Sequence, residues 1–349
     1  MKYRTSMLVL AFAAVASAGI QPSFWLSKCA WDASDVIELG YSPDEGRFFV
    51  AASIKGGGIE PGAITALSLL LPPSNERALL KDLTGHCDLF GRRDCRQNPP
   101  PMRERDRVIV FLRQGGQPAG MTMLTSAVWL QNGKAYVFEQ NFNPGPSHLE
   151  EFHPPSQPFN GIRFEPGSTE AMARSDIAQM LRWRASFDHA ISNPDAHACI
   201  AELAELVTSK DRVVVQATLA RLTKEGPAAA HALRPYLDDD NLLFEHFEIL
   251  DAIAASKGRD VRLDSIINKE QSYWTSRCDL DLGSQCDRNF GEPSTDHYLR
   301  LVSALKAIHA LGVDEDVPAV LAFAALVDHC KNLKDQQELR DVISSVLAK

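Results

Sequence analysis

The sequence predicts an α+β protein of two domains, with a β-rich N-terminal domain and an all-α C-terminal domain. From Asp35 to about Gln140, runs rich in Val, Ile, Phe and Tyr alternate with Gly and Pro, which is typical of strands. Residues 141–167 are rich in Pro, Gly, Asn and Ser and predict an extended linker. From Ser168 onward, apolar residues recur at helical spacing. The predicted domains are therefore residues 19–140 and 168–349.

The first 18 residues have the pattern of a cleavable secretory signal peptide. Lys2 and Arg4 precede an apolar run from Met7 to Val15, and Ala16–Ala18 supply the small residues that a signal peptidase accepts. The apolar run is shorter than the roughly 20 residues needed to span a bilayer, and no later run approaches that length. We therefore expect a secreted or periplasmic protein that begins near Gly19 and has no membrane span after cleavage.

The composition is that of an ordinary globular protein. Hydrophobic residues make up 45% and charged residues 23% of the 349 positions, and the formal net charge is −9. A chain of this length is long enough for two domains. The acidity argues against general nucleic-acid binding, and no cofactor is predicted.

The N-terminal domain begins with a meander of strands. Five or six strands are expected in all, and a run of glycines at 56–58 turns the chain between the second and the third. Leu79, Leu80 and Leu83 lie on one side of a short helix for which Ser74 is the N-cap. The strands predicted before the last hairpin are Asp35–Tyr41, Arg47–Ile54, Ala63–Leu71 and Arg107–Arg113.

The clearest local signal is a two-residue hairpin. Val128–Gln131 and Lys134–Phe138 flank Asn132-Gly133, and a two-residue hairpin turn needs positive φ at both positions, which Asn and Gly tolerate. In that register Trp129 faces Tyr136.

Three strands, a helix and a further hairpin form the element order of the OB-fold, and the domain resembles an OB-like or netrin-like barrel of exported proteins. The resemblance is carried by "ASDVIELG", "IKGGGIEPGAITALSL" and "RDRVIVFLR". It implies an antiparallel β-barrel-like domain. Some relatives of the netrin-like fold inhibit metalloproteases through an N-terminal cysteine. Cys29 lies well inside the mature start and departs from that pattern.

The C-terminal domain contains a repeated helix-ending pattern. Each copy consists of two aliphatic residues followed by a glycine before the next helix. Separate signals for the start of a helix are present at Asn193-Pro194, Gly226-Pro227 and Asp314. The stretch "ATLARLTKEGPAAAHALRPYLDDD" resembles HEAT-like helical pairs, which implies an extended surface for holding partners. The unequal intervals favour a compact irregular stack as the alternative. The three copies are Leu219, Leu222, Gly226; Leu250, Ile253, Gly258; and Leu305, Ile308, Gly312.

The seven cysteines are disulfide candidates in an exported chain. Cys87 with Cys95 and Cys278 with Cys286 each enclose a short polar loop, so local pairing is expected. Cys29 is a competing partner for the first pair. We expect the remaining two, Cys199 and Cys330, to be buried thiols on apolar helix faces.

No strong catalytic or phosphate-binding motif is present, which favours a non-enzymatic function. Three polar groups contain metal-ligating residue types, yet their spacing favours helix-surface residues or solvated loops over a metal site. These groups are Asp188, His189, His197 and Cys199; His148, Glu150, Glu151 and His153; and Asp279, Asp281 and Asp287 around Gly283.

A concentration of arginines follows the predicted helix of the first domain. Guanidinium groups recognise carboxylates and phosphates, so an anionic envelope polymer or an acidic protein is the partner this segment suggests. Interleaved acidic residues favour local ion pairing as the alternative. The candidate ligand-binding residues are Arg92, Arg93, Arg96, Arg105 and Arg107, with Arg103 nearby.

Together these features predict an exported, non-catalytic binding or scaffold protein of the cell envelope or extracellular space. The first alternative is a hydrolase or other enzyme with a site between the domains that uses His148, Glu151 or His153. The second alternative is a protease inhibitor built on the barrel domain.

Overall fold

The computed structural model describes residues 26–56, 104–139, 161–278 and 295–348, except positions 43, 45–46, 121–122, 124–125, 244, 313 and 330–335. The predicted signal peptide, the strand Ala63–Leu71 and the helix Ser74–Leu83 lie outside these residues. The chain divides into two compact units, Met1–Arg182 and Trp183–Lys349.

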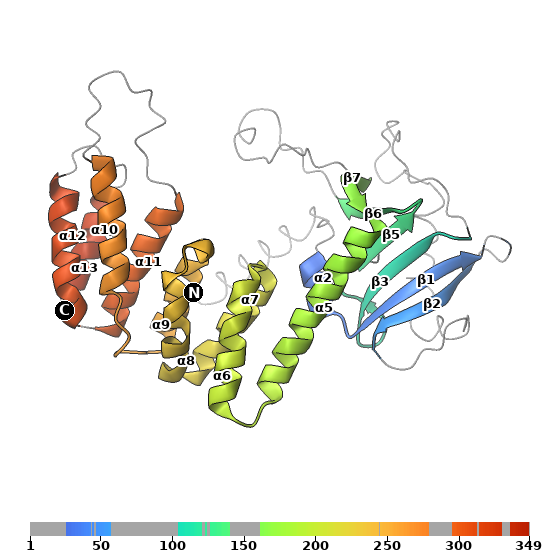
Figure 1. Ribbon diagram of the computed structural model, residues 1–349, viewed down its shortest axis with the longest axis horizontal. Coiled ribbons are helices and arrows are strands. Elements are labelled where there is room, and N and C mark those ends of the chain that lie inside the picture. The colour runs from blue at the N-terminus through green and yellow to red at the C-terminus, as the bar shows by residue number, and fades with distance from the viewer. Residues whose placement is uncertain are drawn as a thin grey trace, which may run out of the picture. The chain divides into compact units, whose positions relative to one another are not determined.

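The first unit contains an antiparallel sheet, so the expected α+β class is confirmed (Figure 1). The strand order is β2-β1-β3-β5-β6-β7, and the short β4 pairs with β3. A short helix, α2 (Leu26–Asp32), precedes the sheet and contacts β3. The strands are β1 (Asp35–Ser42), β2 (Arg47–Lys55), β3 (Arg107–Arg113), β4 (Gln117–Pro118), β5 (Ala127–Gln131), β6 (Lys134–Glu139) and β7 (Gly161–Thr169).

The predicted hairpin is confirmed in its register. Trp129 of β5 pairs with Tyr136 of β6. Asn132 has φ 53° and Gly133 has φ 74°, which are the positive values that a two-residue turn of this kind requires.

The sheet is open, which corrects the expected barrel. Its main core lies on one face and includes Ile37, Leu39, Val110 and Trp129. On β1 and β3, however, consecutive residues are buried, from Val36 to Gly40 and from Val108 to Leu112. Burial on both faces is typical of a sheet covered on both sides, whereas strands of a small soluble barrel alternate between the interior and solvent.

Strand β7 begins within the predicted linker and includes its last residues, 161–167, and helix α5 (Glu170–Ser192) follows directly. Residues 141–160 lie outside the described residues, but Gly161–Phe164 and Thr169 pair with β6. Pro166 lies in this strand but outside its paired residues, so its missing N–H costs no ladder bond. The Thr169 hydroxyl accepts a hydrogen bond from the Met172 amide at 3.1 Å and caps the helix.

The second unit is helical. Three helices follow the predicted start signals: α6 begins just after Asn193-Pro194 and is capped by Asp195, Pro227 is the first residue of α8, and Asp314 opens the turn before α12. After α5 the helices are α6 (Ala196–Glu205), α7 (Arg212–Leu222), α8 (Pro227–Leu233), α9 (His246–Ala255), α10 (Asp264–Cys278), α11 (Thr295–Leu311), α12 (Val317–His329) and α13 (Gln336–Leu347). The 3-10 turns are η2 (Leu206–Ser209), η3 (Thr223–Glu225), η4 (Arg234–Asp238), η5 (Asp240–Leu242) and η6 (Asp314–Asp316).

The aliphatic residues of the repeated pattern form part of the core of this unit. Pairs of them lie in α7, α9 and α11, and each has at most 5% of its surface exposed: Leu219, Leu222, Leu250, Ile253, Leu305 and Ile308. Cys199 is a buried thiol, as expected, and burial raises its pKa. Cys330 lies outside the described residues.

Candidate functional site

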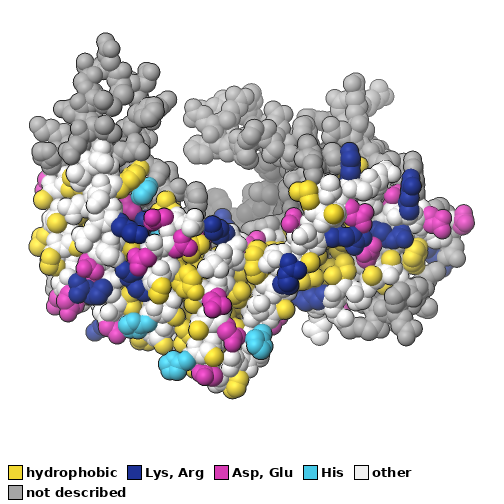
Figure 2. Space-filling model, in the orientation of Figure 1, with side chains coloured by type: hydrophobic (Ala, Val, Ile, Leu, Met, Phe, Trp, Pro, Cys, Tyr) yellow, Lys and Arg dark blue, Asp and Glu magenta, His cyan; other side chains and the backbone are white. Residues whose placement is uncertain are grey.

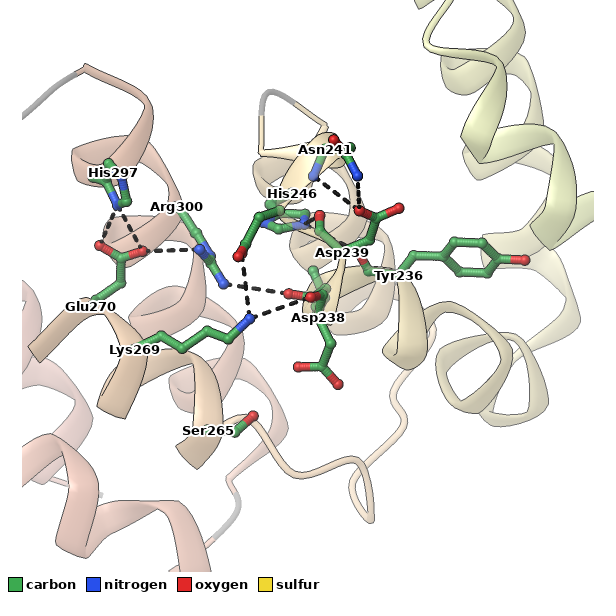
Figure 3. Close-up of polar contacts among 12 residues, drawn as sticks. Tyr236, Asp238, Asp239, Asn241, His246, Ser265, Lys269, Glu270, His297 and Arg300 are labelled. Atoms are coloured by element: carbon green, nitrogen blue, oxygen red, sulfur yellow. Dashed lines mark hydrogen bonds and ion pairs between the residues drawn. The ribbon is translucent and has the colours of Figure 1, made fainter. Parts of the chain in front are cut away.

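A cluster of polar contacts in the second unit surrounds the segment Arg234–Leu242, which we call the carbonyl turn (Figure 3). It consists of η4 and η5, whose short length leaves backbone carbonyls without helical partners. Side chains from three other helices donate to them. Arg300 of α11 reaches the Leu237 carbonyl at 3.3 Å, and Lys269 of α10 reaches the Asp238 carbonyl at 3.3 Å. The cluster therefore ties α10 and α11 to the turn that follows α8.

His246, the first residue of α9, completes these contacts. Its Nε2 lies 3.1 Å from the Tyr236 carbonyl and 3.0 Å from the Asp239 carbonyl. Because both oxygens are acceptors, Nε2 carries the hydrogen, and in the neutral ring Nδ1 is unprotonated. The side chain is fully buried, and its pKa falls to about 4, first because of burial and then because of the Arg300 charge. His246 is therefore neutral near pH 7.

Glu270 of α10 balances the charge of Arg300. Both are buried, and the Arg300 guanidinium lies 3.3 Å from Glu270 Oε1. Trp274 Nε1 donates to Glu270 Oε2 at 3.3 Å. Burial raises the pKa of Glu270, although His297 and Arg300 act in the opposite direction. A buried pair of this kind is costly to break, because removing one partner strands the other charge.

His297 of α11 is the more exposed end of this network. Its Nδ1 lies 3.1 Å from Glu270 Oε2 and its ring stacks on Tyr273, with centroids 3.6 Å apart. The side chain is 21% exposed. A carboxylate that holds Nδ1–H fixes the tautomer in which Nε2 is an acceptor. The arrangement orients an imidazole, which is one component of acid–base chemistry.

A second buried carboxylate in this unit has a structural role. Asp316 accepts hydrogen bonds from the amides of Leu263 at 3.1 Å and Asp264 at 3.2 Å, where α10 begins. Arg262 Nε donates to the same carboxylate at 3.0 Å. Asp316 thus caps α10 from a distant part of the chain.

In the first unit, Glu38 of β1 occupies the sheet face opposite the main core. Two nitrogens of Arg174, from α5, donate to its carboxylate at 2.7 and 2.8 Å. Arg174 also donates to Glu170 at 2.8 Å, and these contacts raise the pKa of the guanidinium. The bidentate pair fixes α5 to the sheet.

The predicted arginine site lies mostly outside the described residues, which exclude Arg92, Arg93, Arg96 and Arg103. Arg105 is exposed. Arg107 donates to the carbonyls of Glu104 and Asp106 and lies 4.0 Å from Glu38, so its charge is engaged within the protein.

The other predicted residues are not brought into one site by the described residues. His189 and His197 lie on different helices, α5 and α6, as their spacing predicted. Cys278 is the last residue of α10. The remaining predicted groups lie outside the described residues: Cys87, Cys95 and Cys286; His148, Glu150, Glu151 and His153; and Asp279, Asp281 and Asp287.

The sequence reasoning missed Glu270, His297, Arg300 and His246. One signal was available for Glu270. It stands four residues after Ile266 and four before Trp274, on a buried stripe of α10 where both of these neighbours are apolar. A carboxylate on an apolar stripe indicates a buried charge that needs a partner.

Within the described residues, no set of three or more His, Cys, Asp and Glu side chains is placed to hold a metal ion. Likewise, no helix among them combines the length and apolar character that crossing a membrane requires. Comparisons with protein-family models, curated proteins and solved structures found no match to this chain.

Proposed function

We propose that the protein is an exported, non-catalytic binding protein whose helical unit holds a protein partner. Export is supported by the signal-peptide pattern of residues 1–18. The binding function rests on one observation in the helical unit, the exposed face of α12.

Helix α12 is apolar on its solvent side as well as on its buried side. Val320, Phe323 and Val327 are buried. Pro318, Leu321, Ala322 and Ala325 recur at helical spacing and are exposed, Leu321 to 52%. No charged residue occurs from Val317 to Leu326. Figure 2 shows hydrophobic side chains over α12 at the left edge of the helical unit.

A helix that is apolar all round is normally buried, and an exposed apolar patch is typical of a contact surface for another protein. The uncharged face favours a protein partner over the anionic polymer suggested by the arginines. The polar groups at the carbonyl turn support the non-catalytic part of the proposal, because Arg300, Lys269 and His246 engage backbone carbonyls.

The test is affinity capture from the native envelope or extracellular fraction with three immobilised mature proteins: the wild type, Leu321→Arg and the control Ser344→Arg. Ser344 is an exposed position on α13. We expect one protein to be enriched by the wild type and by the control, and to be lost with Leu321→Arg. Its retention should change little with salt, because an apolar contact is not screened.

Equal capture by all three proteins, or no reproducible enrichment by any, would overturn the proposal. Circular dichroism of each variant establishes that the helical unit is folded before capture.

A second candidate function, an enzyme, is favoured by the His297–Glu270 pair. A buried carboxylate that orients a partly exposed imidazole occurs in sites of proton transfer. It differs from the sequence-based alternative, which placed the site at His148, Glu151 and His153. Turnover of an ester or amide in a hydrolase panel that is lost in His297→Gln would favour the enzyme. Unchanged turnover in that variant would remove this candidate.

A further inference from the structure

The carbonyl turn lies between α8 and α9, and His246 both donates a hydrogen bond to two of its carbonyls and begins α9. We propose that this turn is an acid-sensitive latch: protonation of His246 favours opening of the turn and of the first part of α9. This acid sensitivity is a property of the helical unit itself and does not depend on which partner the unit binds.

The hydrogen-bond geometry of His246 carries the argument. The ring is fully buried, and Nε2–H is used by two carbonyls. Nδ1 is also buried and has no hydrogen-bond partner among the described residues. A proton added to Nδ1 would create a buried cationic donor without an acceptor, which is costly in a protein interior. Opening the turn gives that proton access to water.

The charges that face His246 come from α11 and from the carbonyl turn itself. Arg300 of α11 lowers the pKa of His246, whereas Asp240 of η5 raises it. Asp239, whose carbonyl accepts from His246, has a pKa lowered mainly by its hydrogen bonds with Asn241. These effects together disfavour a positive charge on His246 beside the Arg300 guanidinium, because burial and Arg300 lower its pKa more than the nearby carboxylates raise it.

Two carboxyl groups act in the opposite direction on acidification. Glu245 precedes His246, and burial raises its pKa; its Oε2 is buried without a partner in the described structure. Glu270, which neutralises Arg300, also has a pKa raised by burial. These groups take up protons in the folded state and stabilise it as the pH falls, so the contribution of His246 must be isolated by substitution.

The size of the effect follows from linkage. A folded-state pKa of about 4 lies below the ordinary value of 6.5, so the open state binds more protons in the interval between them. Stability from neutral His246 is complete above pH 6.5 and is lost as the pH falls toward 4. Between pH 7.5 and 5.0, the opening equilibrium should rise about 30-fold, and below pH 4 the limit is about 300-fold.

Hydrogen exchange of the full mature protein, measured by mass spectrometry at pH 7.5 and 5.0 and corrected for intrinsic rates, tests the latch. Peptides covering 234–250 should lose about 30-fold more protection in the wild type than in His246→Gln, whose amide can still donate to a carbonyl. His231→Gln is the matched control, since His231 is an exposed residue of α8 paired with Asp260 at 2.8 Å. Glu245→Gln, which keeps His246, should lose more protection on acidification than the wild type does.

Equal loss of protection in the wild type and in His246→Gln would overturn the proposal. A direct measurement on the wild type covers the case in which the glutamine variant does not fold. The pH dependence of exchange at the imidazole C2 hydrogen reports the pKa of His246 itself. A value well below 6.5 supports the latch, and a value at or above 6.5 overturns it.

Discussion

Replacing Arg174 by Met should destabilise the first unit strongly, although Arg174 is only part-buried. The substitution keeps a long apolar side chain but removes both hydrogen bonds to Glu38, at 2.7 and 2.8 Å. Glu38 is 9% exposed and, among the described residues, would keep only the Arg107 guanidinium, 4.0 Å away. Stranding a buried charge costs about 3–5 kcal/mol. Because the Arg174 side chain is 36% exposed, water can partly replace it, and we expect about 2–3 kcal/mol.

The assay is native-state hydrogen exchange of peptides covering β1 and β3, which gives the free energy of opening of the sheet. Lys28→Met is the matched control. Lys28 pairs with Asp32 at 3.3 Å, but its side chain is 53% exposed, so its loss should cost less than about 1 kcal/mol.

The double variant Arg174→Met with Glu38→Met completes a double-mutant cycle. Removing both charges should restore most of the lost stability, because the penalty comes from the stranded carboxylate and not from the missing pair. A coupling energy below about 0.5 kcal/mol would refute this reasoning. It would mean that Glu38 is solvated well enough without Arg174.

Three further substitutions test the helical unit by urea unfolding followed by circular dichroism. Arg300→Met should cost about 3–5 kcal/mol and be largely rescued by Glu270→Leu; additive losses would contradict a buried pair. Asp316→Ala should cost about 1–2 kcal/mol by uncapping α10, and a neutral result would show that water caps the helix instead. Gly258→Ala would place a Cβ 2.3 Å from that of Ala230, so it should cost about 1–3 kcal/mol and be relieved by Ala230→Gly. If Ala230→Gly does not restore the stability lost in Gly258→Ala, the strain does not come from contact with Ala230.

Peptide mapping without reduction tests the cysteine pairing. We expect disulfide-linked peptides joining Cys87 to Cys95 and Cys278 to Cys286, while Cys199, which is buried, should react with a thiol reagent only after unfolding. Linkage of Cys29 to either member of the first pair would contradict the local assignment.

Features governed by neighbouring residues could be predicted from the sequence. The Asn132-Gly133 turn fixed the pairing of Trp129 with Tyr136, because the turn type sets the register. The starts of α6 and α8 followed from Asn193-Pro194 and Gly226-Pro227, which lie within one turn of the helices they precede, although the residue that caps α6 is Asp195.

Features that depend on distant residues could not be predicted. A carboxylate at position 270 indicates a buried charge, but nothing local assigns it to Arg300 on the next helix. Strand β7 is stabilised by its pairing with β6, so a segment whose composition is that of a loop forms a strand. The closed barrel was predicted from element order, which does not specify whether the two edges of a sheet meet.

The direct passage from β7 into α5 determines where the chain can be cut. A truncation within the Pro-rich segment would remove β7, the neighbour of β6, together with Arg174, the bidentate partner of Glu38. Fragments intended to hold the sheet alone should therefore extend through Arg182. Those ending near Gln140 should expose the β6 backbone to solvent and aggregate when expressed separately.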